Sequence, residues 1–326
     1  MQVLLTCNIG QHLQEYIKVE VKLAGKKEAW IHAIRLRTLP LALASILMAS
    51  FLAYYYQSFK WEILVLAAST TTLLQILSNL ANDYGDSIHG ADSENREGPI
   101  RAVQSGIIPL HEMKIAMVIF AVLSLFSGIL LLYVAVSSWL MFWGFIALGL
   151  FAIAAAVTYT SGTKPYGYMG LGDISVFLFF GLTGVLGTLF LHMLDFQSAV
   201  IWPAISLGLF STAVLNINNI RDIKADTQAG KKSIPVRIGK LAAIKYNWAL
   251  IIGGNLFMLI FIFQEKAWGG FLAFLLLPLM VRVGAGVQKG KNSQQIDPFL
   301  KKMAIATLMW VLAFGVGLIL SQRLLV

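Results

Sequence analysis

The sequence predicts an all-α fold, a polytopic membrane bundle of nine transmembrane helices. Of its 326 residues, 58% are hydrophobic and 13% charged, and the mean hydropathy is +0.74. A soluble domain of this length could not bury so much apolar surface. Most apolar runs have about 20 residues, the length at which a helix crosses a bilayer core. The alternating segments of about 10 residues that mark a membrane β-barrel are missing from the sequence. Because Cys7 is the only cysteine, disulfides cannot hold the fold together.

Hydropathy and proline positions divide the chain into a tail and a membrane domain. Residues 1–37 read as a basic cytosolic tail in which residues 17–34 are compatible with an interfacial helix. Residues 38–326 form the nine-span domain. Pro40 and Pro203 fall at helix starts, where proline is tolerated, and Pro278 is expected to kink the eighth span. The expected spans are 39–57, 61–81, 112–133, 138–158, 173–192, 198–217, 242–264, 267–284 and 303–321.

The charges are sorted to one side of these spans. With the N-terminus in the cytoplasm, 22 of the 25 lysine and arginine residues fall on the cytoplasmic side, as the positive-inside rule requires. This sorting explains the net charge of +9 without a nucleic-acid partner. It predicts a multi-pass protein of the cell (inner) membrane. The span centres hold no charged residue, which argues against a transporter, because transporters place ionisable groups at mid-membrane.

Two polar ladders end the second and sixth spans. The first ladder is Asn82 and Asp86, and the second is Asn218, Asp222 and Asp226. Residues four apart lie on one face of a helix, so each ladder presents oxygen ligands at the membrane boundary. Mg²⁺ takes such ligands, together with phosphate oxygens and water. The two ladders therefore predict a site for Mg²⁺ and, through it, a diphosphate.

Asp92 can join these candidate metal ligands only under one condition. Six residues of unbroken helix would turn it about 120° away from the Asp86 face. Asp92 reaches the metal only if the helix stops between Asp86 and Gly90, because a glycine there lets the chain turn back. We therefore expect the second span to end in this interval, with Asp92 in a loop over the site.

Basic and aromatic residues surround the ladders. Basic side chains among carboxylates favour a diphosphate site, although charges of this kind are also common at membrane edges. The loop from Tyr159 to Asp173 contains glycines, a proline and three tyrosines, so it is expected to be a shaped cap; interfacial anchoring is the alternative. The candidate diphosphate ligands are Arg101, Lys164, Arg221 and Lys231.

These stretches resemble the UbiA-type membrane prenyltransferases, and within them the branch that acts on 1,4-dihydroxy-2-naphthoate. The resemblance covers about residue 30 to the C-terminus. The first motif departs from the general pattern, since Gly90 stands where a third acid is expected and Asp92 follows two residues later. The matching stretches are residues 35–40, 79–86, 98–106, 159–173 and 215–226.

The resemblance implies a UbiA-like architecture and a Mg²⁺-dependent transfer. A polyprenyl group would pass from polyprenyl diphosphate to 1,4-dihydroxy-2-naphthoate, with loss of the carboxyl group, to give demethylmenaquinol for menaquinone biosynthesis. It also implies that Arg101 and Lys164 contact the diphosphate and that Tyr159 lies near the reacting carbons. The active site would face the cytoplasm. The alternatives are another aromatic prenyltransferase, acting on 4-hydroxybenzoate or haem, and less favoured, a transporter. The implied catalytic residues are Asp86, Asp222, Asp226 and Tyr159, and the implied metal ligands are Asn82, Asp86, Asp92, Asn218, Asp222 and Asp226.

Overall fold

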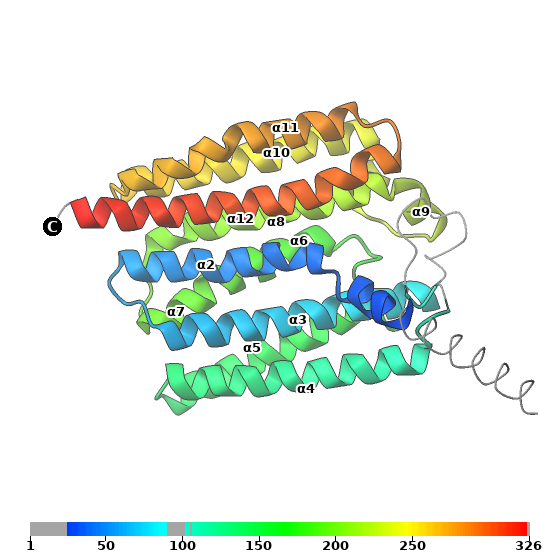
Figure 1. The fold of residues 1–326 in the computed structure, drawn as a ribbon, viewed down its shortest axis with the longest axis horizontal. Helices are drawn as coiled ribbons and strands as arrows, with labels where there is room; N and C mark the ends of the chain where they lie inside the picture. Colours follow the sequence, from blue (N-terminus) through cyan, green and yellow to red (C-terminus); the bar gives the residue numbers. More distant parts are fainter. Residues whose placement is uncertain (1–24, 90–101, 105, 325–326) are drawn as a thin grey trace, which may run out of the picture.

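The computed structural model describes residues 25–89, 102–104 and 106–324. This part of the chain contains helices, turns and bends but no strand. Nine of its helical segments are long and apolar enough to cross a membrane, and they run side by side (Figure 1). The nine-span bundle predicted from the sequence is therefore confirmed, and the chain is a multi-pass membrane protein.

The spans follow the predicted order, some as single helices and some as joined segments. In the first half, residues 25–34 are helical, η1 (Leu36–Thr38) leads into α2, and the fifth span changes helix type twice. The first five spans contain α2 (Leu39–Tyr55), α3 (Trp61–Ile88), α4 (Leu110–Ala135), α5 (Trp139–Thr158), and α6 (Gly172–Val176) with η2 (Phe177–Gly187) and α7 (Thr188–Met193). The rest contain η3 (Ser198–Val200), α8 (Ile201–Arg221), α9 (Ile223–Gln228), α10 (Ile234–Gln264), η4 (Trp268–Leu276), α11 (Leu277–Lys289) and α12 (Ser293–Leu324).

Several helices extend beyond the predicted spans, and they do so at the same end of the bundle (Figure 1). Helix α3 continues to Ile88 and α8 to Arg221, while α10 begins at Ile234 and α12 at Ser293. Hydropathy marks only where the apolar residues stop, whereas the backbone hydrogen bonds continue into the polar layer. These extra turns carry the polar ladders beyond the apolar bundle.

Two spans change helix type internally. The eighth span is a 3₁₀-helix up to Leu276 and an α-helix from Leu277, with Pro278 in the first turn of α11. Pro278 thus lies where the span changes from a 3₁₀-helix to an α-helix. It occupies the first turn of α11, where proline is tolerated. In the fifth span, η2 is a π-helix, and an added Cβ on Gly181 would lie 2.6 Å from the Cα of Gly208. The two glycines allow η2 and α8 to pack backbone to backbone.

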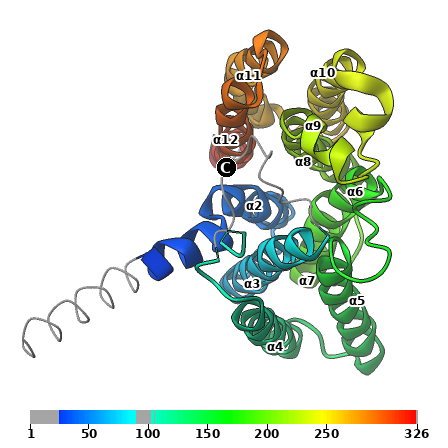
Figure 2. The same ribbon diagram turned by 90° about the vertical axis from the view of Figure 1, so that its right-hand side faces the viewer.

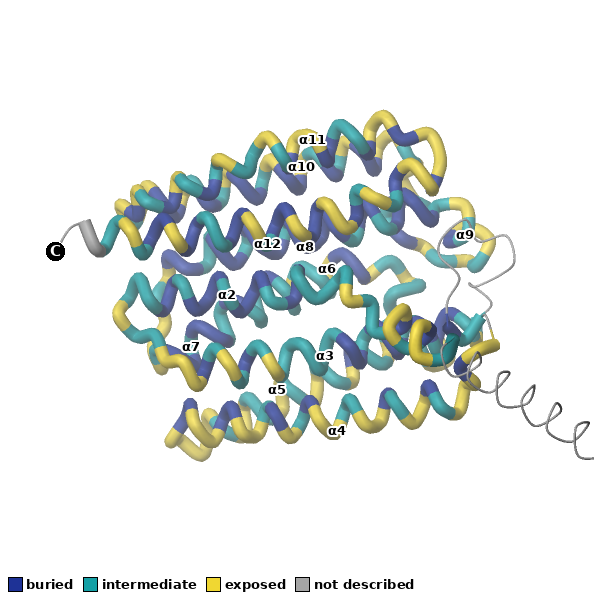
Figure 3. The backbone as a smooth tube through the Cα atoms, in the orientation of Figure 1, coloured by how far each residue is buried: buried dark blue, intermediate teal, exposed yellow. Residues whose placement is uncertain are grey.

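Helix α8 runs through the main hydrophobic core. It packs against α2, α10 and α12 (Figure 2), where Phe210 meets the Trp310 ring at 5.1 Å between centroids. Helices α3 and α4 form a second cluster around Leu77 and Met113. Much of α4 is exposed (Figure 3), and the exposed apolar side chains of α4 and α5 include Tyr133 and Leu140. Such surfaces suit contact with lipid rather than water.

The end of α3 confirms the expected stop. The helix ends at Ile88, and His89 is its C-cap. The main-chain N–H of His89 donates to the Gly85 carbonyl at 3.1 Å. This boundary lies between Asp86 and Gly90, as Asp92 requires if it is to reach the site. Gly90 and Asp92 themselves lie outside the described residues.

Candidate active site

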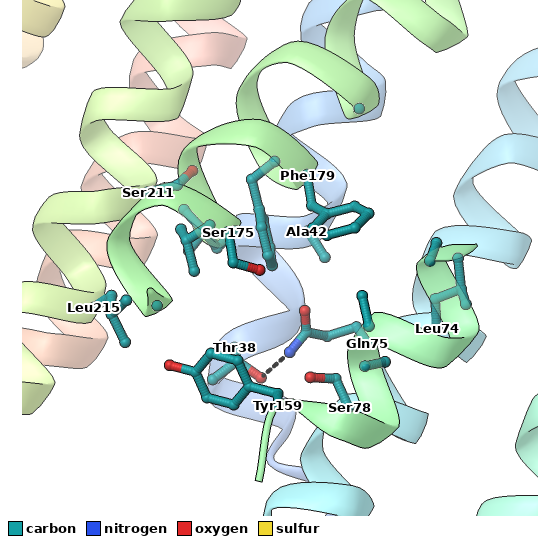
Figure 4. A pocket seen from close by; sticks show the side chains of 18 of the residues that line it. Thr38, Ala42, Leu74, Gln75, Ser78, Tyr159, Ser175, Phe179, Ser211 and Leu215 are labelled. Atoms are coloured by element: carbon teal, nitrogen blue, oxygen red, sulfur yellow. Dashed lines mark hydrogen bonds between the residues drawn. The ribbon is translucent and has the colours of Figure 1, made fainter. Parts of the chain in front are cut away.

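A cavity of about 430 Å³ lies among α2, α3, α5, η2 and α8. Its middle is largely apolar, with Ala42, Leu74 and Phe179 around it (Figure 4). Its polar end contains the side chains of both ladders. The structure therefore brings together two motifs that are far apart in the sequence. The residues at this end include Asn82, Asp86, Asn218, Asp222, Asp226 and Lys231.

The first ladder occupies the last turns of α3. Asp86 is 2% exposed; it accepts a hydrogen bond from the Tyr168 hydroxyl at 2.7 Å and lies 3.0 Å from the Lys231 ammonium. The side-chain amide oxygen of Asn82 (Oδ1) accepts a hydrogen bond from the Thr160 hydroxyl at 3.2 Å. The partners of this ladder thus come from distant segments of the chain.

Gly85 makes that arrangement possible. A Cβ at this position would overlap the backbone oxygen of Thr160, because the two atoms would be closer than real Cβ contacts come. The Thr160 hydroxyl also donates to the Ala81 carbonyl at 2.8 Å. The chain after α5 is therefore held directly on α3, and this contact fixes the start of the loop that contains Tyr159 and Tyr168.

The second ladder is held by a buried arginine. The Arg221 guanidinium donates to both carboxylate oxygens of Asp222, from Nε at 2.7 Å and from Nη2 at 2.6 Å, and Nη2 also donates to Asn218 at 2.8 Å. Its Nη1 lies 2.5 Å from Asp297 of α12, which is also 3.6 Å from Arg37. Paired charge-assisted bonds of this kind fix orientation. The main-chain N–H of Asp226 donates to the Asp222 carbonyl at 2.8 Å, which keeps the two acids one turn apart.

Lys231 connects the two ladders. Its ammonium lies 3.0 Å from Asp86, 3.6 Å from Asp226 and 4.6 Å from the centre of the Tyr168 ring. The main-chain N–H of Lys231 donates to the main-chain carbonyl of Asp226 at 2.9 Å, so a backbone hydrogen bond also helps to position the Lys231 side chain. Both ladders therefore face one point at the polar end of the cavity.

Burial shifts the proton affinity of two residues at this end. Desolvation raises the pKa of Asp226 to about 6; Lys231 opposes the shift, whereas Asp222 and Asp86 add to it. Desolvation also raises the pKa of Tyr159, and the nearby Tyr166 hydroxyl raises it further. Tyr159 is therefore a neutral phenol at ordinary pH. A cation next to Asp226 would favour its ionised form.

The donor set suits a hard divalent cation. Carboxylate and amide oxygens gather at the polar end, and they are the ligands that Mg²⁺ takes. Among the described residues, however, no three Asp, Glu, His or Cys side chains form a ligand cluster by themselves. A Mg²⁺ ion here would complete its shell with amide oxygens, phosphate oxygens and water, as it does in other phosphate-binding sites.

The predicted diphosphate ligands are not all placed alike. Lys231 lines the cavity, whereas Lys164 is exposed and is not among the lining residues. Arg221 is 3% exposed, and its contacts favour positioning of the second ladder over direct contact with a diphosphate. Arg101 and Asp92 lie outside the described residues. The roles of Lys164, Arg101 and Asp92 stay predictions.

Sequence reasoning missed several residues of the site. Tyr168 was expected only as part of a capping loop, yet it contacts Asp86. Arg37 lies in a stretch that carried the family resemblance, without an assigned role. Asp297 gave no signal in the sequence, because its link to Arg221 joins two spans that are separated by two others. Gln75 and Asn79 also line the cavity.

Residues 42–311 of the chain match the UbiA prenyltransferase family. The chain belongs to that family. Within the family it is similar to curated proteins named 1,4-dihydroxy-2-naphthoate octaprenyltransferase. Those from Escherichia coli (strain K12) and Haemophilus influenzae are each 42% identical over 299 residues, which is 91% of this chain and 97% of theirs. The protein of that name from Mycobacterium tuberculosis is 33% identical over 294 residues, 90% of this chain and 97% of its own. These relatives confirm the resemblance to the naphthoate branch.

Solved UbiA structures share the fold. A UbiA homologue from Aeropyrum pernix K1 superposes with a TM-score of 0.60 at 18% identity, covering 89% of this chain and 98% of that one. A UbiA homologue from Archaeoglobus fulgidus, solved with DMAPP and Mg²⁺, gives 0.58 at 16% identity, covering 87% and 98%. At these identities the likeness establishes the arrangement of helices in this UbiA-family chain.

Proposed function

We propose that this chain transfers a polyprenyl group from polyprenyl diphosphate to 1,4-dihydroxy-2-naphthoate. The acceptor loses its carboxyl group, and the product is demethylmenaquinol, an intermediate of menaquinone biosynthesis. One observation carries the proposal: Lys231 lies within 3.0 Å of Asp86 and 3.6 Å of Asp226, so both ladders serve one site. The relatives named for this reaction support the choice of acceptor.

The polar end of the cavity would bind the diphosphate. Mg²⁺, when bound, would neutralise the departing diphosphate. The two ladders would hold the ion, with Asp92 as a further predicted ligand. Lys231 supplies a positive charge at the same end, and Arg101 and Lys164 are the further predicted contacts. Arg221 would keep Asp222 and Asn218 in place.

The remainder of the cavity would hold the reacting carbons. Its apolar walls suit an isoprenoid chain, and Tyr159 projects among them (Figure 4). The Tyr159 ring can face the allylic cation that forms when the diphosphate leaves, because aromatic faces attract cations. The aromatic acceptor would then attack that cation.

A two-acceptor assay tests the proposal. Membranes containing the protein would be incubated with Mg²⁺, a labelled polyprenyl diphosphate and either 1,4-dihydroxy-2-naphthoate or 4-hydroxybenzoate. We expect labelled, decarboxylated product from the naphthoate alone, and none from the Asp86→Ala variant. Transfer to 4-hydroxybenzoate instead would favour the other aromatic prenyltransferases. If the protein transfers the label to neither of these acceptors, nor to haem in a third incubation, a transferase role is wrong.

We also propose that the site faces the cytoplasm of a cell whose inner membrane holds the protein. The charge sorting supports this orientation. With Cys7 replaced by serine, single cysteines at the exposed positions Asn292 and Asp195 would probe the two ends. An impermeant thiol reagent added to intact cells should label Asp195→Cys and leave Asn292→Cys unlabelled. The reverse pattern would overturn the orientation.

A further inference from the structure

Gln75 presents an amide group to the middle of the cavity. It lies on α3, three turns before Asp86, and its side chain points into the space near Ser78, Tyr159 and Phe179 (Figure 4). It contributes to neither polar ladder, and its hydrogen bonds go to Asn79 and Thr38. An amide in such a wall is costly unless it is hydrogen-bonded, so its partners show what it is placed to do.

A chain of hydrogen bonds fixes the direction of the Gln75 amide. The Asn79 amide donates to the Ile34 carbonyl at 2.8 Å and to the Thr38 hydroxyl at 3.0 Å. The Gln75 amide nitrogen donates to the side-chain amide oxygen of Asn79 (Oδ1) at 3.1 Å and to the Thr38 hydroxyl at 3.4 Å. The Thr38 hydroxyl donates in turn to the Arg35 carbonyl at 2.9 Å, so its oxygen is an acceptor for both amides.

The reverse orientation is excluded by the same chain. A main-chain carbonyl can only accept, so the Asn79 nitrogen must face Ile34 and its oxygen must face Gln75. A rotated Gln75 amide would then place two carbonyl oxygens against each other. The network therefore leaves the Gln75 Oε1 atom directed into the cavity, away from Thr38 (Figure 4). Within the part of the chain that the structure describes, no hydrogen bond is made to this atom.

A fixed amide oxygen selects for a hydrogen-bond donor. The isoprenoid chain has no donor, and an ionised diphosphate has only acceptors. An aromatic acceptor with ring hydroxyls does have donors, and the Tyr159 and Phe179 rings nearby suit its flat apolar face. We propose that Gln75 Oε1 is a specificity-determining group that accepts a hydrogen bond from a ring hydroxyl of the acceptor. This assignment rests on the proposed function.

The test compares binding of acceptors that differ by one hydroxyl. The dissociation constants of 1,4-dihydroxy-2-naphthoate and its two monohydroxy analogues would be measured for the wild type and for Gln75→Met. Binding is the readout because the loss of a hydroxyl also lowers the reactivity of the ring. Gln75→Asn, which withdraws the amide by one methylene, is the second variant. Gln288→Met is the matched control, since Gln288 bonds Trp248 outside the cavity.

We expect the wild type to bind one monohydroxy analogue about 10-fold more weakly than the dihydroxy acceptor, the effect of one neutral hydrogen bond. Gln75→Met and Gln75→Asn should weaken binding of the dihydroxy acceptor by a similar factor. The dissociation constant of that monohydroxy analogue should stay the same in both variants. Donor affinity should stay at the wild-type value in both variants. The Gln288→Met control should keep the wild-type preference.

Two results separate this inference from the proposed function. If either Gln75 variant keeps the wild-type preference against both analogues, the assignment to Gln75 is overturned although the naphthoate remains the acceptor. If the protein binds 4-hydroxybenzoate rather than the naphthoate, the proposed function fails. The same variants then test Gln75 with 4-hydroxybenzoate and benzoate, and an unchanged preference for the hydroxyl would overturn the inference there as well.

Discussion

The two polar ladders share the N-x-x-x-D spacing, but different parts of the fold hold their acids. Asp86 is held by Tyr168 and Lys231, which come from other segments. Asp222 is held by Arg221, its own neighbour in the sequence. The residue before the acid is Gly85 in the first ladder and Arg221 in the second. A glycine lets another segment approach closely, whereas an arginine fills the same place and carries the partner itself.

The comparison shows that the spacing of a motif and the support of its acid are separate properties. A helix places an acid one turn after an asparagine in both ladders. The supporting group in the first ladder depends on the loop after α5, and in the second on a charge network that reaches α12. We therefore expect the first ladder to depend on loop contacts and the second to depend on buried ion pairs.

The largest expected effect comes from removing either acid. Asp86→Ala and Asp222→Ala should each lower turnover by more than the roughly 100-fold typical of outer-shell changes at metal sites. Asp222→Ala should also destabilise the fold by about 3 kcal/mol, because it removes one partner of the buried Arg221 ion pair. Asp86→Ala should destabilise the fold less, because Asp226 remains beside Lys231. Activity assays and thermal unfolding in detergent would measure both effects. Equal unfolding temperatures for the two variants would contradict the difference between the ladders.

A smaller effect is expected when the support is removed and the acid kept. Asp297→Asn should weaken Mg²⁺ binding by about 10-fold to 100-fold through the looser hold on Arg221. Tyr168→Phe should have a smaller effect, since it removes one hydrogen bond while Lys231 remains. Calorimetric titration with Mg²⁺ and inorganic diphosphate would compare them. If Tyr168→Phe proved the more harmful, the second ladder would not be the more dependent on its support.

A third test concerns the position before the acid. Gly85→Ala should destabilise the protein by about 1–3 kcal/mol, because the new methyl group would overlap the Thr160 backbone. Gly144→Ala is the control, since no atom lies within 4 Å of its added Cβ, and alanine there should be neutral or stabilising. Thermal unfolding of both variants would decide. A Gly85→Ala protein as stable as the wild type would mean that the loop can shift without loss.

The smallest effect should come from the exposed lysine. Lys231→Met should weaken diphosphate binding about 10-fold or more, because its ammonium lies between the two ladders and charge-assisted bonds are the strong ones. Lys164→Met should change the same constant only a few-fold, since an exposed charge interacts weakly through water. Competition of labelled polyprenyl diphosphate with inorganic diphosphate would measure both. A Lys164 effect equal to that of Lys231 would mean that the loop closes over the ligand.

Much of the membrane architecture followed from the sequence alone. The nine spans, the stop of α3 before Gly90 and the clustering of acids at one end were all predicted. They depend on local properties: apolar length, the helical repeat and the sorting of charges. Span limits were less accurate where α3 and α8 continue past the apolar edge, because hydropathy does not register hydrogen bonds in the polar layer.

What the sequence by itself determined was therefore which residues each helix carries to its end. Which side chains meet there was decided by the tertiary structure alone. Asp297 reaches Arg221, Tyr168 reaches Asp86, and Gln75 is aimed into the cavity through Asn79 and Thr38. Each of these contacts joins or orients groups from different spans or loops. Their geometry depends on how helices pack in three dimensions, and no local pattern of residues encodes that packing.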